Sequence, residues 1–347
     1  MRKAERFADV FPLLGVGRAG EALDLGAVRA AFDAILAGAW TPVEVGAFAV
    51  ALRVLGESTE AIVAGALALR GAMTAVETDG EGVLDTCGTG GDSQGTLNLS
   101  TGAAILAAAV GVPVAKHGNR SISSRCGSAD VVEALGIPID VPPERQREVL
   151  ARAGIAFLFA PAHHPALRHA AQARRELGIR TIFNALGPLA NPARATHQLV
   201  GVYDDALRPV FAHALDRLGV QRAWVVRSED GLDEVSPSAP TCVTELDRGV
   251  VRERLVTPED FGVGRQDRES IAGAESQANA AALEAILQGR PHPAREPVVL
   301  NAAAALVVAR GMEPREAAQA AGRALDDGSA WARLERWRRA AREARDP

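Results

Sequence analysis

The spacing of hydrophobic residues divides the chain into a helical beginning and a longer part in which strands and helices alternate. In residues 1–76 the apolar positions recur at helical spacing, and Thr41 and Glu44 form a capping box with proline at the first helical position. No stretch of this part alternates as a strand would. The apolar positions of the clearest helix are Val28, Ala31, Phe32, Ile35 and Leu36.

From residue 83 onward, short β-like runs alternate with helical patterns. Strands are predicted at 83–86, 112–116, 155–159, 198–203 and 223–226, and a hairpin at 241–246 and 250–255. Helices are predicted at 102–110, 129–135, 143–153, 164–178, 206–218, 274–288, 297–310, 314–326 and 329–344. This alternation favours a mostly parallel sheet with helices on its faces. The predicted class is α/β, with a small N-terminal helical domain and a large sheet domain.

Composition narrows the class of protein. The 347 residues are 48% hydrophobic with a mean hydropathy of +0.03, which is typical of a soluble globular protein. No apolar run approaches the roughly 20 residues that span a bilayer, and charges interrupt the N-terminus, so neither a membrane span nor a signal peptide is predicted. The net charge of −5 disfavours nucleic-acid binding. Three cysteines without CxxC spacing favour a reducing cytoplasm.

A glycine-rich loop, GTGGD at 88–92, follows the first predicted strand. Glycines let a ligand approach the backbone N–H groups closely, and the helix that follows adds donors and a positive dipole end. A phosphate suits such a loop. Two known phosphate motifs do not fit, because a dinucleotide fingerprint needs glycine at Ser93 and a P-loop needs lysine after Gly95, where Thr96 stands. Taken alone, the loop could equally be an ordinary surface turn.

The second predicted strand ends in a polar loop, KHGNR at 116–120, and a hydroxyl-rich turn follows it. Ser128 is the predicted N-cap of the next helix. The carboxyl ends of neighbouring parallel strands form the usual ligand-binding edge of an α/β sheet. Two polar loops at consecutive strand ends therefore predict one shared binding site.

These motifs together resemble the anthranilate phosphoribosyltransferase family. The resemblance rests on GTGGD at 88–92, NxST at 98–101, KHGNR at 116–120 and GSAD at 127–130, and it spans nearly the whole chain. A further segment, 180–192, is similar to the family's RTxFNxLGPLxNP, with Ala190 in place of the common threonine. Its glycine, proline and asparagine content predicts a long turn.

An acidic stretch after the strand at 223–226 contains Asp233 and Glu234. From the residues alone it could be a surface turn or a Mg²⁺ site, since Mg²⁺ favours carboxylates together with substrate phosphates. The resemblance favours the metal site, because this pair matches the family's DE pair. Arg227 and Ser228 stand where many members have His-Gly, which could alter the mobility of this loop.

The resemblance also implies a role for each site residue. Residues implied for phosphoribosyl pyrophosphate are Gly88, Thr89, Gly90, Gly91, Asp92, Thr96, Asn98, Ser100, Thr101, Lys116 and Ser128. Those implied for anthranilate are Gly88, His117, Asn119, Arg174 and Gly187, and those for Mg²⁺ are Asp233, Glu234 and Ser100. No acid–base residue is expected, because an aromatic amine is weakly basic and largely neutral at pH 7.

The activity implied is transfer of the 5-phosphoribosyl group from phosphoribosyl pyrophosphate to anthranilate, the second step from chorismate towards tryptophan. The implied fold is that of the nucleoside phosphorylases and related phosphoribosyltransferases. Its helical domain covers 1–78 and about 165–192, its α/β domain covers about 79–164 and 193–347, and the site lies between them. A homodimer through the helical domain is expected. The alternatives are a pyrimidine nucleoside phosphorylase, which KHGNR and the DE pair disfavour, and a relative that has lost activity and binds nucleic acid.

Two other clusters are predicted to be structural. His163 and His164 are adjacent, and since neighbouring side chains seldom converge on one ion, they indicate a helix entry rather than a metal site. Near the C-terminus, Trp331, Leu334, Trp337 and Ala341 form an apolar helical stripe, and the arginines between them are predicted to face solvent.

Overall fold

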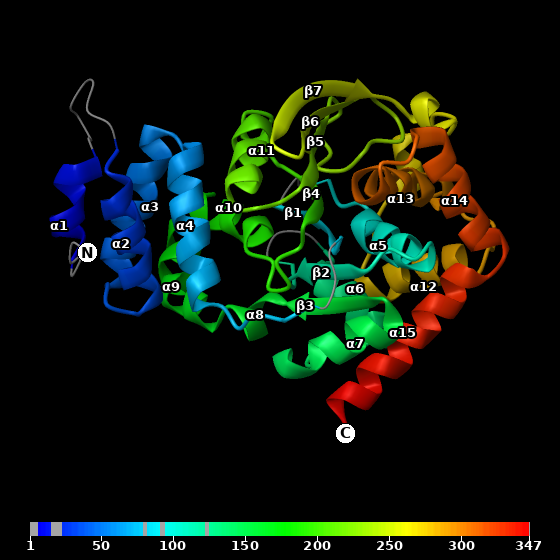
Figure 1. The fold of residues 1–347 in the computed structure, drawn as a ribbon, viewed down its shortest axis with the longest axis horizontal. Helices are drawn as coiled ribbons and strands as arrows, with labels where there is room; N and C mark the ends of the chain where they lie inside the picture. Colours follow the sequence, from blue (N-terminus) through cyan, green and yellow to red (C-terminus); the bar gives the residue numbers. More distant parts are fainter. Residues whose placement is uncertain (1–5, 15–22, 79–81, 91–93, 122–124, 347) are drawn as a thin grey trace.

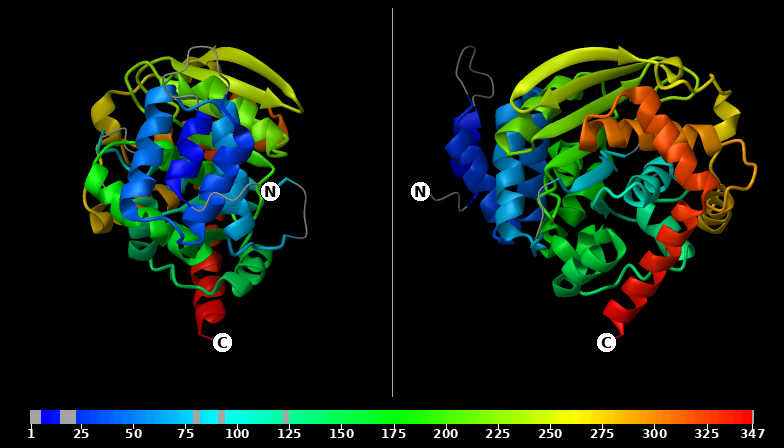
Figure 2. Two further views of the ribbon diagram at one scale, coloured as in Figure 1. Left: turned by 90° about the vertical axis from the view of Figure 1, so that its left-hand side faces the viewer. Right: turned by 45° about the vertical axis from the view of Figure 1, so that its right-hand side comes forward.

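The N-terminal helices lie at one end of the molecule and the C-terminal helices at the other (Figures 1 and 2). The computed structural model describes residues 6–14, 23–78, 82–90, 94–121 and 125–346. The first part contains α1 Phe7–Val10, α2 Leu25–Leu36, α3 Pro42–Leu55 and α4 Thr59–Ala72, so the predicted helical beginning is confirmed. The capping box is confirmed too, because the Thr41 N–H donates to Glu44 Oε2 at 3.0 Å.

A seven-stranded sheet forms the centre of the second part. The strands are β1 Leu84–Gly88, β2 Val114–Gly118, β3 Ile155–Phe159, β4 His197–Gly201, β5 Arg222–Ser228, β6 Thr241–Asp247 and β7 Val250–Val256. Their order is β3-β2-β1-β4-β5-β6-β7; the first five are parallel and the last two form an antiparallel hairpin. The predicted mostly parallel sheet is confirmed.

The second part also contains eleven α-helices among the described residues. They are α5 Leu99–Ala109, α6 Ser128–Ala134, α7 Gln146–Ala153, α8 Ala160–His163, α9 Arg168–Leu177, α10 Ile182–Leu189, α11 Leu207–Arg217, α12 Ser276–Leu287, α13 Arg295–Arg310, α14 Pro314–Asp326 and α15 Ser329–Arg345. Of these, α5, α7, α8, α11, α13 and α15 contact the strands. Within the described residues, no helix combines the length and the apolar character needed to cross a membrane.

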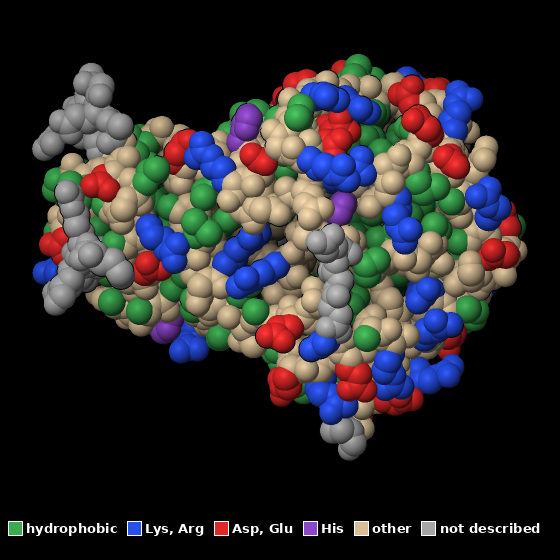
Figure 3. Space-filling view, in the orientation of Figure 1, with side chains coloured by type: hydrophobic (Ala, Val, Ile, Leu, Met, Phe, Trp, Pro, Cys, Tyr) green, Lys and Arg blue, Asp and Glu red, His purple; other side chains and the backbone are tan. Residues whose placement is uncertain are grey.

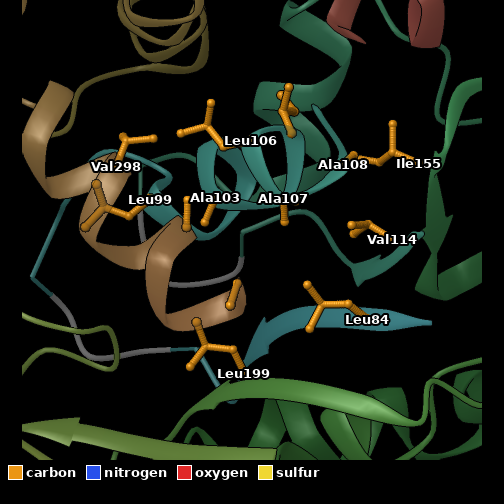
Figure 4. Close-up of a cluster of buried hydrophobic side chains, with 14 of the residues drawn as sticks. Leu84, Leu99, Ala103, Leu106, Ala107, Ala108, Val114, Ile155, Leu199 and Val298 are labelled. Carbon is orange, nitrogen blue, oxygen red and sulfur yellow. The ribbon is translucent and has the colours of Figure 1, made fainter. Parts of the chain in front are cut away.

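The two faces of the sheet belong to different cores, because successive strand residues point to opposite faces. On β4, Leu199 belongs to the core that contains residues of α5 and α13, whereas Val200 belongs to the core that contains residues of the N-terminal helices and α11. Figure 4 shows Leu84, Val114 and Ile155 on the sheet side of α5, Leu199 below α13, and Val298 of α13 next to Leu99 at the start of α5. Helices α5 and α13 therefore lie side by side on one face of the sheet.

Segment 180–192 is not the predicted long turn, since it contains helix α10. Asn184 Oδ1 accepts the N–H of Thr181 at 3.1 Å, which caps the helix, and Ile182, Phe183 and Leu186 are buried. Pro188 is near the C-terminal end, where a missing N–H removes little helical bonding. The free energy gained by burying this apolar face stabilises the helix despite the glycine, proline and asparagine residues that favour a turn. Both α9 and α10 pack against the N-terminal helices, although the domain boundaries themselves stay a prediction.

The apolar stripe of the C-terminal helix α15 is confirmed, since Leu334, Trp337 and Ala341 are buried. The prediction for its arginines is wrong at two positions. Arg333 donates to the carbonyl of Ala153 at 2.6 Å, and Arg338 donates to the carbonyl of Leu135 at 2.6 Å. These side chains satisfy carbonyls at helix C-termini instead of facing solvent.

Candidate functional site

The acidic pair lies directly against the ends of β1 and β4. A Cβ atom on Gly201 would lie 1.7 Å from the backbone oxygen of Asp233, and one on Gly88 would lie 3.1 Å from Asp233 Oδ2. Only glycine allows so close an approach at Gly201. The glycines that end β1 and β4 thus allow the turn that contains Asp233 and Glu234 to lie against the glycine-rich loop.

A pocket of about 170 Å³ lies at this edge of the sheet. It is lined by predicted residues from four separate segments: Gly88, Gly90, Thr96, Asn98, Ser100, Ser128, Asp233 and Glu234. It is also lined by residues that were not predicted: Cys87, Gly95, Leu97, Arg125, Cys126, Gly127 and Ala274. The fold therefore brings the glycine-rich loop, the hydroxyl-rich turn and the acidic pair into one cavity.

The N-terminus of α5 is held by charged groups. Glu234 Oε1 accepts the N–H of Ser100 at 3.2 Å, and a carboxylate is stabilising at this positive end of a helix. On the side of the protein interior, Lys116 Nζ donates to Ser100 Oγ at 3.2 Å and to the carbonyl of Thr86. Lys116 is 1% exposed and does not line the pocket, so it supports Ser100 from the interior.

Behind Lys116 lies a buried carboxylate, Asp85. Its two oxygens accept the N–H of His117 at 3.1 Å and the side-chain amide of Asn191 at 2.7 Å. Burial raises the pKa of Asp85, and the charge of Lys116 opposes that rise. Burial likewise lowers the pKa of Lys116, and Asp85 opposes this fall. The pair ties β1, β2 and the end of segment 180–192 together, a network that the sequence motifs did not indicate.

The loop after β2 is packed tightly against the turn before α6. Asp130 Oδ2 accepts the N–H groups of Ser121 at 3.1 Å and Gly127 at 2.9 Å. Partial burial alone would raise the pKa of Asp130, but these N–H groups and Arg120 lower it below its ordinary value. The prediction that Ser128 is the N-cap of α6 is wrong. Gly127 occupies the N-cap position, and the Asp130 side chain accepts its backbone N–H.

A distant loop closes the pocket on the side of Asn98. The side-chain amide of Asn279 donates to Asn98 Oδ1 at 3.1 Å, and Asn279 Oδ1 accepts the N–H of Ala274 at 2.7 Å. The backbone of Gly273 donates to the carbonyl of Gly95 at 2.8 Å. Nothing in the spacing of residues near 274 pointed to this role, since the contact depends on the tertiary fold.

His117 belongs to a buried cluster beside α10. Its Nδ1 lies 3.2 Å from the carbonyl oxygen of Gly187, and its ring centroid is 5.0 Å from that of His164. Burial holds the pKa of His117 well below its usual value, with His164 and His163 as further causes. His117 and Gly187, which were predicted for the same ligand, thus lie together, but neither lines the pocket.

The buried histidines make stability depend on pH. Burial, and then the charge of His163, lower the pKa of His164 to about 4. The folded protein therefore binds fewer protons than the unfolded chain between pH 6.5 and 4, so stability falls as the pH falls through this range. The shift corresponds to about 3 kcal/mol. We expect urea unfolding of His164→Gln to depend less on pH than that of the wild type.

The matched control for this prediction is His213→Gln, because His213 is exposed. It should leave the pH dependence of unfolding as it is in the wild type. Equal pH dependence in the wild type and His164→Gln would contradict the assignment.

The remaining predicted residues lie outside the pocket lining. Thr89 Oγ1 accepts the N–H of Tyr203 at 3.0 Å, and Thr101 is fully buried within α5. Asn119 is exposed, and its carbonyl accepts Ser128 Oγ at 3.3 Å, which places it at the pocket margin. Gly91 and Asp92 fall outside the residues that the structure describes.

Arg174 lies in the last turn of α9, half-buried. Among the described residues its guanidinium has no hydrogen bond or ion pair, and burial lowers its pKa. A partly desolvated guanidinium without a carboxylate partner is suited to binding one from a ligand. The adjacent Arg175 is exposed.

The pocket residues fit a Mg²⁺ ion that shares its coordination with a substrate. In the part of the chain that the structure describes, no group of three or more His, Cys, Asp or Glu side chains is placed to hold a metal alone. Two carboxylates do line the pocket, together with the Ser100 hydroxyl. Mg²⁺ is commonly held by one or two carboxylates plus substrate phosphates and water, which suits this set.

The chain matches two descriptions of protein families. Residues 80–331 match "Glycosyl transferase family, a/b domain", and residues 13–73 match "Glycosyl transferase family, helical bundle domain". It is 48% identical over 318 residues to anthranilate phosphoribosyltransferase of Moorella thermoacetica, covering 91% of this chain and 94% of the relative. The enzyme of Methylocella silvestris is likewise 48% identical, over 92% of this chain and 91% of the relative.

Solved structures of the same enzyme resemble this fold. Anthranilate phosphoribosyltransferase from Thermus thermophilus superposes with a TM-score of 0.88 at 41% identity, covering 93% of this chain and 97% of that one. The enzyme from Saccharomyces cerevisiae in complex with PRPP and Mg gives a TM-score of 0.89 at 26% identity, over 98% of this chain and 99% of that one.

Proposed function

Because the chain belongs to the anthranilate phosphoribosyltransferase family, we propose that it transfers the 5-phosphoribosyl group of phosphoribosyl pyrophosphate to the amine of anthranilate. The products are N-(5-phosphoribosyl)anthranilate and pyrophosphate, in the second step from chorismate towards tryptophan. The observation that carries this proposal is the single pocket in which the glycine-rich loop, Ser100 and the acidic pair meet.

The chain's task is mainly to position two substrates and to stabilise charge. The amine of anthranilate is largely neutral at pH 7, so no residue is assigned as a general base. Negative charge develops on the departing pyrophosphate while positive charge develops on the ribose. The backbone at Gly88 and Gly90, with Asn98 and Ser128, supplies preorganised donors on the pyrophosphate side. Holding the amine in line with the reacting carbon of the ribose lowers the activation barrier further.

Asp233, Glu234 and Ser100 are the residues that would hold Mg²⁺ beside the pyrophosphate. Bound there, the ion would neutralise charge on the leaving group. Glu234 also keeps Ser100 in place through the 3.2 Å hydrogen bond at the start of α5. The relative solved with PRPP and Mg supports this proposal.

Anthranilate is proposed to lie on the side of His117, Asn119, Gly187 and Arg174. Arg174 would hold its carboxylate, while the His117–Gly187 contact fixes the wall beside it. The structure of the yeast enzyme in complex with 4-fluoroanthranilate supports an aromatic carboxylate as the acceptor in this family.

Arg174→Ala is expected to raise the KM for anthranilate at least about 10-fold, because a hydrogen bond to a charged group contributes roughly 1.5–3 kcal/mol. The KM for phosphoribosyl pyrophosphate should change little. Steady-state kinetics with each substrate varied in turn measures both. Arg175→Ala, next to it on the exposed side, is the matched control. An equal rise in both KM values would remove the assignment.

We also propose that the chain forms a homodimer through its helical part. Large hydrophobic side chains are exposed there, including Val43 at 80% and Val54 at 77%. Figure 3 shows hydrophobic side chains on the surface of that end of the molecule. Sedimentation velocity on the purified protein would distinguish the dimer from a monomer.

The reaction is tested by the fluorescence of anthranilate. The purified protein, phosphoribosyl pyrophosphate and MgCl₂ should together cause a loss of fluorescence, and omitting the metal should prevent it. A folded protein that causes no loss with all components present would contradict the proposal.

A further inference from the structure

A second cavity, of about 360 Å³, lies at the opposite edge of the sheet. Val83, Pro113 and Gly154 line it, and each directly precedes a strand, β1, β2 or β3. Five-residue strands separate the two edges by roughly 16 Å. A ligand in this cavity would therefore not touch the residues assigned to either substrate.

The floor of this cavity is apolar. Val83, Ala108, Val112 and Leu150 line it, and each is less than a tenth exposed. Figure 4 shows Ala108 near Ile155 and Val114, the first residues of β3 and β2. Such a floor favours a ligand with an apolar body, because covering it removes apolar surface from water.

Two arginines of α15, Arg333 and Arg336, line one side. Arg333 donates to the carbonyl of Ala153, and within the described residues the guanidinium of Arg336 has neither a hydrogen bond nor an ion pair. Burial, and then the charge of Arg336, lower the pKa of Arg333. Neither guanidinium has a carboxylate partner in the described part of the chain, so an anion between them would relieve this repulsion.

Two arginines of α7, Arg147 and Arg152, line the cavity as well. Arg152 pairs with Glu148 at 3.1 Å and also with Glu343, and Arg147 lies 4.0 Å from Glu77. Four guanidinium groups thus surround an apolar floor. The planar forks of the two without a carboxylate partner, Arg333 and Arg336, match a carboxylate, and their charge disfavours a ligand that carries an ammonium group.

We propose that this cavity binds a small aromatic carboxylate, with its ring on the apolar floor and its carboxylate between Arg333 and Arg336. The volume lies within the range of roughly 300–1,000 Å³ typical of small-molecule sites. Inorganic phosphate is disfavoured, since it would gain nothing from the floor. This site is separate from the proposed reaction and does not depend on it.

Isothermal titration calorimetry with 3-phenylpropionate tests the proposal. The Arg333→Gln/Arg336→Gln variant should bind it at least about 10-fold more weakly than the wild type, and the neutral 3-phenylpropanol should bind the wild type equally weakly. Arg339→Gln is the matched control, because Arg339 is exposed on the same helix and does not line the cavity. Turnover of anthranilate should be unchanged in both variants.

Three results would overturn the proposal. They are unchanged affinity in the double variant, equal affinity for the neutral alcohol, and phosphate binding as tight as that of the acid. Loss of binding in Arg174→Ala would also overturn it, by placing the acid at the anthranilate side. If the double variant fails to fold, Arg336→Gln alone replaces it, since that side chain is exposed.

Discussion

Asp233→Asn is expected to lower kcat/KM at least about 100-fold, because a catalytic metal ion contributes several kcal/mol and about 2.7 kcal/mol corresponds to a 100-fold change. Asp233 lines the pocket, and its carboxylate faces Gly88 at the end of β1. Losing its charge should weaken Mg²⁺ binding, so the Mg²⁺ concentration needed for half-maximal rate should rise. Initial rates over a series of MgCl₂ concentrations measure both effects.

Glu229→Gln is the control, because Glu229 is exposed in the same acidic stretch and does not line the pocket. It should leave the rate and its Mg²⁺ dependence unchanged. If Asp233→Asn retained wild-type Mg²⁺ dependence, Asp233 would have to be removed from the proposed metal site.

Gly201→Ala is expected to impair both folding stability and activity. Its Cβ would lie 1.7 Å from the backbone oxygen of Asp233, and backbone cannot rotate away as a side chain can. Overpacking of this kind costs roughly 1–3 kcal/mol. The acidic turn must also shift, and a displacement of about 1 Å near a reacting group can cost about 100-fold in rate. Urea unfolding and kcat/KM for anthranilate measure the two losses.

Gly264→Ala provides the comparison, since a Cβ at Gly264 would meet nothing within 4 Å. That variant should match the wild type in both measurements. Should Gly201→Ala behave in the same way, the close approach of Asp233 to β4 would not be needed for the site.

The central strands could be predicted because their residues are buried on both faces and so form short apolar runs. The limits predicted for the strand at 155–159 coincide with β3 Ile155–Phe159. Both β1 and β2 begin later than predicted, at Leu84 and Val114, and extend beyond their predicted ends to Gly88 and Gly118. Helix α10 was missed because its tertiary contacts outweigh the turn-forming residues in its sequence.

The candidate site was predictable where motifs follow strand ends, as at Gly88, Ser100 and Glu234. It was not predictable where a residue acts from inside the protein or from a distant loop. Asp85 is buried and reaches Asn191 across the fold, and Asn279 contacts Asn98 from a remote helix. Such contacts follow from the packing of the whole chain and leave no local spacing to detect.

The small side chains of α5 also constrain how this protein can vary in sequence. Gly102 faces α13, and a Cβ there would lie 2.8 Å from a methyl group of Val298. Since the distance between packed helices follows their contact side chains, a larger residue would move the start of α5 and with it Ser100. Substitution at the contact between Gly102 and Val298 is therefore restricted by the need to keep Ser100 in place. A position that touches no substrate can be as intolerant of change as one that does.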